Sequence, residues 1–269
     1  MKNLLKYRDL LWQLALRDIK LQYQRPFLGF LWMLIIPFST AIIYKILFSD
    51  FFRISSKNYP FFIHLITALL PWNYFASSVQ RANRCILESR NIVNRIRVPL
   101  YLLPAAAVLV NLINFLPTLI ILFGFLIGFK VQISAMIIFL PFVILIHSIM
   151  TLGISFAVAG LQVIYRDVEY VVQIALMTIF FLTPSVYTFD EIAGRVSPAL
   201  IKIYMLNPFT GILNLYRAVL IKGYVGDLSG YGTFLNMVIN PLLWGAVFIL
   251  AGYAIFKACE KKFFDFINI

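Results

Sequence analysis

Residues 100–129 read LYLLPAAAVLVNLINFLPTLIILFGFLIGF, without one charged side chain. A helix needs about 20 mostly apolar residues to cross the roughly 30 Å hydrocarbon layer of a bilayer. This longer run therefore predicts a transmembrane helix that tilts or continues past the membrane surface. Five further stretches are also long and apolar enough, so the sequence predicts six spans, at 28–48, 60–80, 100–129, 133–164, 170–189 and 235–256.

The composition of the whole chain supports a membrane protein. Of its 269 residues, 62% are hydrophobic and only 13% are charged, whereas soluble domains carry about 25% charged residues. Too little polar surface remains to cover a water-soluble fold, so the apolar excess must face lipid. We expect residues 1–269 to form a single all-α integral membrane domain.

Basic residues indicate the orientation of the predicted spans. The net charge is +12, and the Lys and Arg residues gather in short segments beside the spans rather than in a nucleic-acid-binding patch. The N-terminus, the 81–99 loop, the 165–169 turn and the C-terminal tail hold 15 of them, and the opposite side holds 7. The positive-inside rule then places both termini in the cytoplasm, for a multi-pass protein of the cytoplasmic (inner) membrane.

The predicted spans carry no acidic residue at their middle, where an ion-coupled transporter usually keeps one. The chain also lacks a phosphate-binding GxxxxGK[ST] loop and any metal-binding motif. Gly124 and Gly128 form a GxxxG pair that is typical of close helix packing. We therefore expect no cofactor or metal in this chain, and any energy for transport has to come from a partner.

Two cytoplasmic segments have features of a partner-binding surface. Residues 1–26 predict a basic amphipathic helix, with an apolar stripe that includes Trp12 and Ile19 and a basic stripe that includes Arg17 and Lys20. Nineteen residues at 81–99 are many for a plain turn between spans. A docking helix explains the charged stripe of the second segment, although a solvated charged face remains the alternative there. For the N-terminal helix, the alternative is a simple membrane anchor.

On the opposite side, residues 190–222 predict two short helices. Ser197-Pro198 and Asn207-Pro208 each place a good N-cap residue before proline, which favours the first helical position. The helices, at about 198–206 and 208–221, are too short to cross and predict a re-entrant hairpin that forms an outer gate. Two interfacial packing helices are the alternative.

Aromatic residues make up 16% of the chain. Many flank the spans as interfacial belts, but others lie at several depths, where they suit the stacking of sugar rings. Lipid-facing or buried packing is the alternative for each of them. The candidates for lining a channel are Phe30, Phe38, Tyr44, Trp72, Tyr74, Phe75, Phe180 and Phe181.

Three motifs together resemble those of a known family. They are LALRDIKLQYQRPFLGFLW at Leu14 to Trp32, YRD at Tyr165 to Asp167, and the Asn207-Pro208 pair followed by Arg217. The pattern is similar to the membrane subunits of type-2 ABC exporters, in the branch that exports O-antigen, capsular polysaccharide and teichoic acid. The chain departs from many relatives at Pro26-Phe27.

This resemblance implies a function and partners. The chain would be a permease without enzymatic activity that forms a homodimer, binds two cytoplasmic ATPase subunits that hold ATP and Mg, and exports a lipid-linked glycan. The N-terminal helix and the 81–99 segment would contact the ATPase, and Pro198, Asn207, Pro208 and Arg217 would belong to the outer gate. A lipid or drug exporter and a membrane enzyme acting on lipid-linked sugars are the rival functions. The residues that we assign to partner docking are Arg17, Asp18, Lys20, Arg84, Glu88, Arg90 and Arg95.

Overall fold

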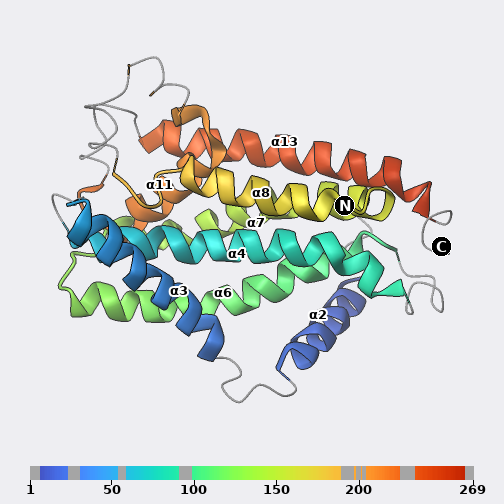
Figure 1. Ribbon diagram of the computed structural model, residues 1–269, viewed down its shortest axis with the longest axis horizontal. Helices are drawn as coiled ribbons and strands as arrows, with labels where there is room; N and C mark the ends of the chain where they lie inside the picture. The colour runs from blue at the N-terminus through green and yellow to red at the C-terminus, as the bar shows by residue number, and fades with distance from the viewer. Residues whose placement is uncertain are drawn as a thin grey trace.

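The computed structural model describes residues 7–23, 31–53, 59–90, 99–188, 197, 201, 204–224 and 234–263. In this part of the chain the backbone forms a bundle of helices (Figure 1), with an isolated bridge between Ile133 and Ile221. The long helices run side by side, while the first two helices lie obliquely against them. The helices are α2 (Arg8–Tyr23), α3 (Trp32–Tyr44), α4 (Phe61–Glu88), α6 (Leu102–Gly128), α7 (Leu140–Ile164), α8 (Val168–Phe181), α11 (Pro208–Leu220) and α13 (Phe234–Glu260).

Two of these helices are extended by a turn of different geometry. A π-helical segment at Lys45–Phe51 continues α3, and a 3-10 helix at Ala135–Phe139 precedes α7. With these extensions, four segments of the described chain are long and apolar enough to cross a membrane. They are Leu34–Phe51, Leu102–Gly128, Ala135–Ile164 and Met237–Glu260.

The prediction of a fifth helix that continues to residue 189 is wrong. Helix α8 ends at Phe181 after 14 residues, a length of about 21 Å, which is shorter than the hydrocarbon layer. The chain then turns, because Pro184 has no backbone N–H with which to continue the helical ladder. The hydroxyl of Ser185 stabilises this turn by donating to the carbonyl of Phe180 at 2.8 Å.

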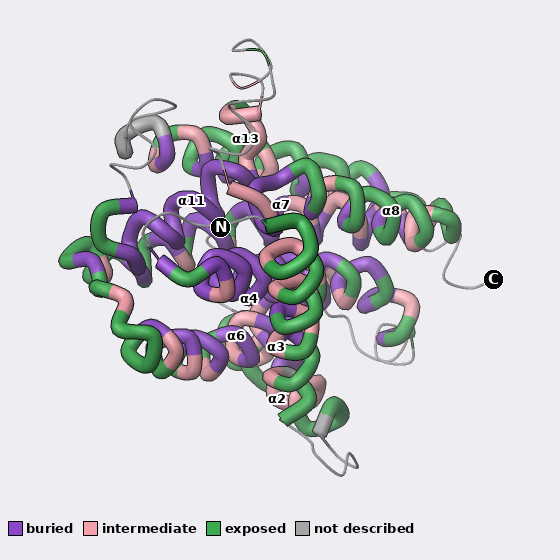
Figure 2. The backbone as a smooth tube through the Cα atoms, turned by 60° about the vertical axis from the view of Figure 1, so that its left-hand side comes forward, coloured by how far each residue is buried: buried purple, intermediate pink, exposed green. Residues whose placement is uncertain are grey.

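Helix α4 is the centre of the bundle. It packs against α3, α6, α7, α8 and α11, and most of its 28 residues are buried (Figure 2). A helix of this length spans about 42 Å. Because protein covers so much of it, α4 accommodates more polar residues than a helix surrounded by lipid.

Helices α7 and α13 pack at very short range through two glycines. A Cβ atom added to Gly252 would lie 1.8 Å from the carbonyl oxygen of Gly153, a separation that no side chain tolerates. In contrast, nothing lies within 4 Å of a Cβ added to Gly124 or Gly128. The close packing predicted for that GxxxG pair is therefore absent from the described part of the chain, and the α7–α13 contact provides it instead.

An apolar cluster that is separate from the main core of the bundle closes one end of it. It joins Leu14 of α2 to the ends of α4, α6, α7 and α13, and includes Cys85, Tyr101 and Phe256. The side of α2 that packs inward carries Leu14 and Ala15, whereas Trp12 of the predicted apolar stripe is 50% exposed. Trp12 thus faces away from the bundle, which leaves it available to lipid, whereas Ile19 of the same stripe is half-buried.

Candidate functional site

Polar contacts at this end of the bundle connect α2 to α4 and α6. Arg81 donates to the side-chain oxygen of Gln22 at 2.7 Å, and the amide of Asn114 donates to the same oxygen at 3.4 Å. Gln22 lies in the last turn of α2, and the first half of the helix packs on the apolar cluster through Leu10, Leu11 and Leu14. The helix is therefore held to the bundle at both ends.

An ion pair connects α4 to α8 on the other side. Arg84 donates to the carboxylate of Glu169, and this hydrogen bond raises the pKa of Arg84. Glu169 follows directly after the YRD turn and lies in the first turn of α8. A carboxylate is favoured there by the helix dipole, which places a partial positive charge at the N-terminus.

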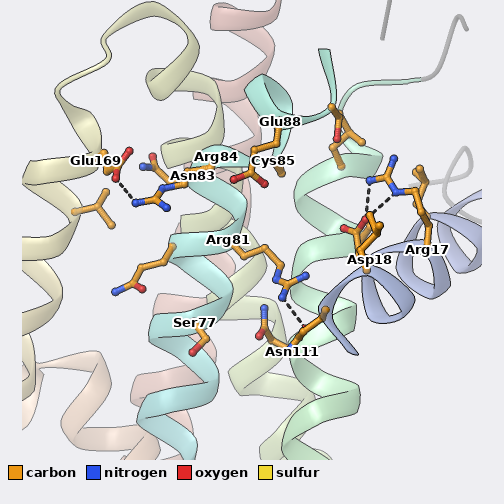
Figure 3. Close-up of a pocket in the computed structure, with 18 of the residues that line it drawn as sticks. Arg17, Asp18, Ser77, Arg81, Asn83, Arg84, Cys85, Glu88, Asn111 and Glu169 are labelled. Carbon is orange, nitrogen blue, oxygen red and sulfur yellow. Dashed lines mark hydrogen bonds and ion pairs between the residues drawn. The ribbon is translucent and has the colours of Figure 1, made fainter. Parts of the chain in front are cut away.

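Between α2 and α8 a cavity of about 770 Å³ opens over α4 and α6 (Figure 3). It lies within the size range of small-molecule sites. Three arginines and three acidic residues line it, so the charges are balanced. These charged residues are Arg17, Asp18, Arg81, Arg84, Glu88 and Glu169.

The cavity brings together four of the seven residues assigned to docking. Arg17 and Asp18 form an ion pair at 2.6 Å, and Arg84 and Glu88 come from the facing helix. Lys20 and Arg90 are exposed nearby on α2 and at the end of α4. Arg95 lies outside the described residues. Whether these side chains contact a partner stays a prediction.

Two buried residues in this cavity were not singled out from the sequence. Asn83 is 2% exposed, and its amide oxygen has no hydrogen-bond partner among the described residues. Cys85 is also buried, and burial raises the pKa of its thiol. Ser77 and Gln80 also line the cavity and were not singled out either. Ser77, Gln80 and Arg84 follow one another at spacings of three and four residues, which places them on one face of α4, so this spacing could have identified them from the sequence.

At the opposite end, α11 begins as predicted. Asn207 is its N-cap and accepts a hydrogen bond from the backbone N–H of Phe209 at 3.0 Å. The same side chain donates to the carbonyl of Leu182 at 3.3 Å, so it also connects α11 to the turn after α8. Pro198 lies outside the described residues, and the outer gate itself stays a prediction.

Arg217 is the most unusual residue of this end, because its side chain is completely buried. It donates to the carbonyl oxygens of Pro184 at 2.7 Å and His64 at 3.0 Å, and its Nε lies 3.4 Å from the hydroxyl of Thr67. A buried cation is tolerated only when hydrogen bonds replace its hydration. Arg217 thus connects α11 to α4 and to the 182–185 turn.

Most of the aromatic candidates are packed inside the bundle. Trp72, Tyr74, Phe75 and Phe180 are between 2% and 7% exposed, and Trp72 contacts Phe180 with ring centroids 5.4 Å apart. Phe38 and Tyr44 are half-buried and Phe181 is 42% exposed. Phe30 lies outside the described residues. Contact with a cargo stays a prediction for all eight.

The apolar bundle and the charged cavity at one end together define a class of protein. Several apolar helices long enough to cross a bilayer make this a multi-pass membrane protein. The chain belongs to the ABC-2 type transporter family, which it matches over residues 9–221.

The curated relatives are similar over nearly their whole length. The chain is 30% identical to the O-antigen export system permease protein RfbA of Myxococcus xanthus, over 91% of this chain and 92% of the relative. It is 28% identical to the protein of the same name from Klebsiella pneumoniae, over 95% of this chain and 93% of the relative.

Proposed function

We propose that this protein is the membrane subunit of an ABC transporter that exports a lipid-linked polysaccharide, of the O-antigen class, across the cytoplasmic membrane. The observation that carries this proposal is the family match over residues 9–221 together with end-to-end similarity to O-antigen export permeases. Hydrolysis of ATP with Mg is assigned to a separate cytoplasmic subunit, because the sequence holds no phosphate-binding loop.

The proposed topology has six membrane segments with both termini in the cytoplasm. Four of them are the apolar helices identified above, and α4 and α8 supply the other two. The 182–185 turn follows the end of α8, and α11 then packs against α4, α7 and α13. Burial of α11 from Phe209 to Leu220 supports a re-entrant hairpin rather than a surface helix.

The proposed partners are a second copy of the chain and two ATPase subunits. The proposed docking surface, which we call the rim, consists of exposed Lys20 on α2, exposed Arg90 just after α4, and Glu88 of the cavity lining. Exposed Trp12 of α2 is assigned to the interfacial region of the membrane, where a tryptophan ring is favoured.

Deleting the gene from its cell of origin and restoring it on a plasmid tests this function. We expect surface polysaccharide to be lost on deletion, with lipid-linked glycan accumulating inside, and to return with the wild-type gene. Purification of the membrane protein is expected to bring an ATPase with it. Unchanged surface polysaccharide in the deletion strain contradicts the proposal.

A further inference from the structure

The surface of α4 differs from that of the other long helices. Its exposed row consists of Ser77, Gln80, Arg84 and Glu88, all of them polar. The exposed rows of α6 and α13 are apolar instead, with Ile120 and Leu250 each 72% exposed. Apolar rows of this kind suit lipid, whereas an uncovered polar row at the same depth does not.

The polar row extends from the end of the bundle toward its middle. Ser77 lies eleven residues before Glu88, which is about 16 Å along the helix axis. Asn111, on the facing wall of the same cavity, lies nine residues inside the apolar segment Leu102–Gly128, or about 13 Å. Figure 3 shows Ser77 and Asn111 together at the end of the cavity away from Glu88 and Glu169. The cavity therefore penetrates the depth at which other helices present apolar side chains.

The chemistry of the cavity favours an uncharged ligand with hydroxyl groups. Its three arginines are matched by three carboxylates, so no net charge is left to attract an ion. Its deeper part carries the hydroxyl and amide groups of Ser77, Gln80 and Asn111. Asn83 also lines the cavity, about 9 Å along α4 from Ser77 toward Glu88, and its buried amide oxygen lacks a donor among the described residues.

We infer that the inner part of this cavity is a binding subsite for the sugar hydroxyls of the exported glycan, and that the exposed row of α4 forms one wall of a water-filled path into the membrane. This inference rests on the proposed function for the identity of the ligand. Its physical core, that water reaches Ser77 and Gln80, is independent of that function.

Thiol accessibility tests the water-filled path. Single Ser77→Cys and Gln80→Cys variants are treated in membrane vesicles with a charged methanethiosulfonate reagent, which reacts with the hydrated thiolate. Ile120→Cys is the matched control on an apolar row, and the wild-type chain, whose two cysteines are buried, gives the background. We expect modification at least tenfold faster at residues 77 and 80 than at 120. Rates no faster than at residue 120 overturn the inference.

Measuring export of surface polysaccharide tests whether the cavity binds the glycan. Gln80→Leu keeps the helix but removes the amide, and we expect at least a fivefold loss of surface polysaccharide at an unchanged amount of protein in the membrane. Ile120→Leu should export normally. If Gln80→Leu fails to accumulate, Gln80→Ala replaces it. Normal export by the polar-row variant overturns the glycan subsite, whereas failure of the wild-type gene to restore export overturns the proposed function instead.

Discussion

At the scale of single residues, Arg217 and the glycine pair show how much depends on one side chain. The buried guanidinium of Arg217 donates to the backbone carbonyls of Pro184 and His64, and the carbonyl of His64 also accepts from the hydroxyl of Thr67. Gly153 and Gly252 act through the absence of a side chain, because the backbones of α7 and α13 touch there. The sequence shows that these residues are present, but it does not show which groups they contact in the fold.

Replacing Arg217 by Met is expected to destabilise the protein strongly. Each hydrogen bond from a charged group is worth about 1.5–3 kcal/mol, and Met removes the donor to the carbonyl of Pro184 and the charged donor to that of His64, which keeps only the hydroxyl of Thr67 as a side-chain donor. We expect the thermal midpoint of the detergent-solubilised protein to fall by several degrees, and Arg217→Lys to fall less. Lys222→Met, at an exposed position, is the control. An equal midpoint for Arg217→Met and the control contradicts this role.

Gly252→Ala is expected to push α7 and α13 apart. Its Cβ would lie 1.8 Å from the carbonyl oxygen of Gly153, so the helices must shift. Gly124→Ala adds the same methyl group where nothing lies within 4 Å, and there a better helix propensity stabilises by up to about 1 kcal/mol. Thermal unfolding of the two variants should therefore move in opposite directions. Similar midpoints would be evidence against the direct backbone contact.

At the scale of elements, the ends of the helices decide how they are joined. The N-cap of α11 and the early end of α8 are connected through Asn207, whose side chain contacts both. At the other end of the bundle, the Arg84–Glu169 pair links α4 to the start of α8. Helix α8 is thus attached at each end by one polar side chain from another element.

The two roles of Asn207 are separable by substitution. Asn207→Ala loses both the cap and the contact with Leu182, and loss of an N-cap alone costs about 1 kcal/mol. Asn207→Asp keeps an oxygen for the backbone N–H of Phe209 but has no amide to donate. We expect Asp to lie between wild type and Ala in a denaturation experiment. An Asp variant as stable as wild type assigns the whole effect to the cap.

Exchanging the charges of the Arg84–Glu169 pair separates stability from coupling. The Arg84 side chain is 52% exposed, and exposed ion pairs contribute at most about 1 kcal/mol. Arg84→Glu alone should therefore leave unfolding almost unchanged yet reduce export, because it repels α8 at Glu169. Combining it with Glu169→Arg should recover export. If the double variant stays as defective as the single one, Arg84 acts through another contact.

At the scale of the whole molecule, the two ends of the bundle have different organisations. One end carries the balanced charged cavity and exposed basic residues, and the other carries a buried cation and a capped helix packed into the bundle. Such an asymmetry fits a protein that meets a soluble partner on one face of the membrane only. Variants at the charged end are therefore expected to affect assembly with the partner, and variants at the other end are expected to affect stability.

Reversing the exposed basic charges of the rim tests the partner surface. Lys20→Glu with Arg90→Glu changes the rim by four charge units, and we expect the copurified ATPase to fall at least threefold while the protein stays folded. Lys222→Glu, at the other end, should not change it. Full retention of the ATPase in the Lys20 and Arg90 variant removes the rim from the docking surface.

By itself, the sequence determined the class of fold, most helix positions and the N-cap at Asn207, because hydrophobic runs and capping residues act over short distances along the chain. It predicted charged docking residues, and four of them meet in one cavity. Only the tertiary structure decided that α8 ends at Phe181, that Arg217 is buried, and that the close glycine contact is Gly153–Gly252 rather than Gly124–Gly128. These features depend on groups from distant helices, whose meeting is set by packing and not by any local pattern.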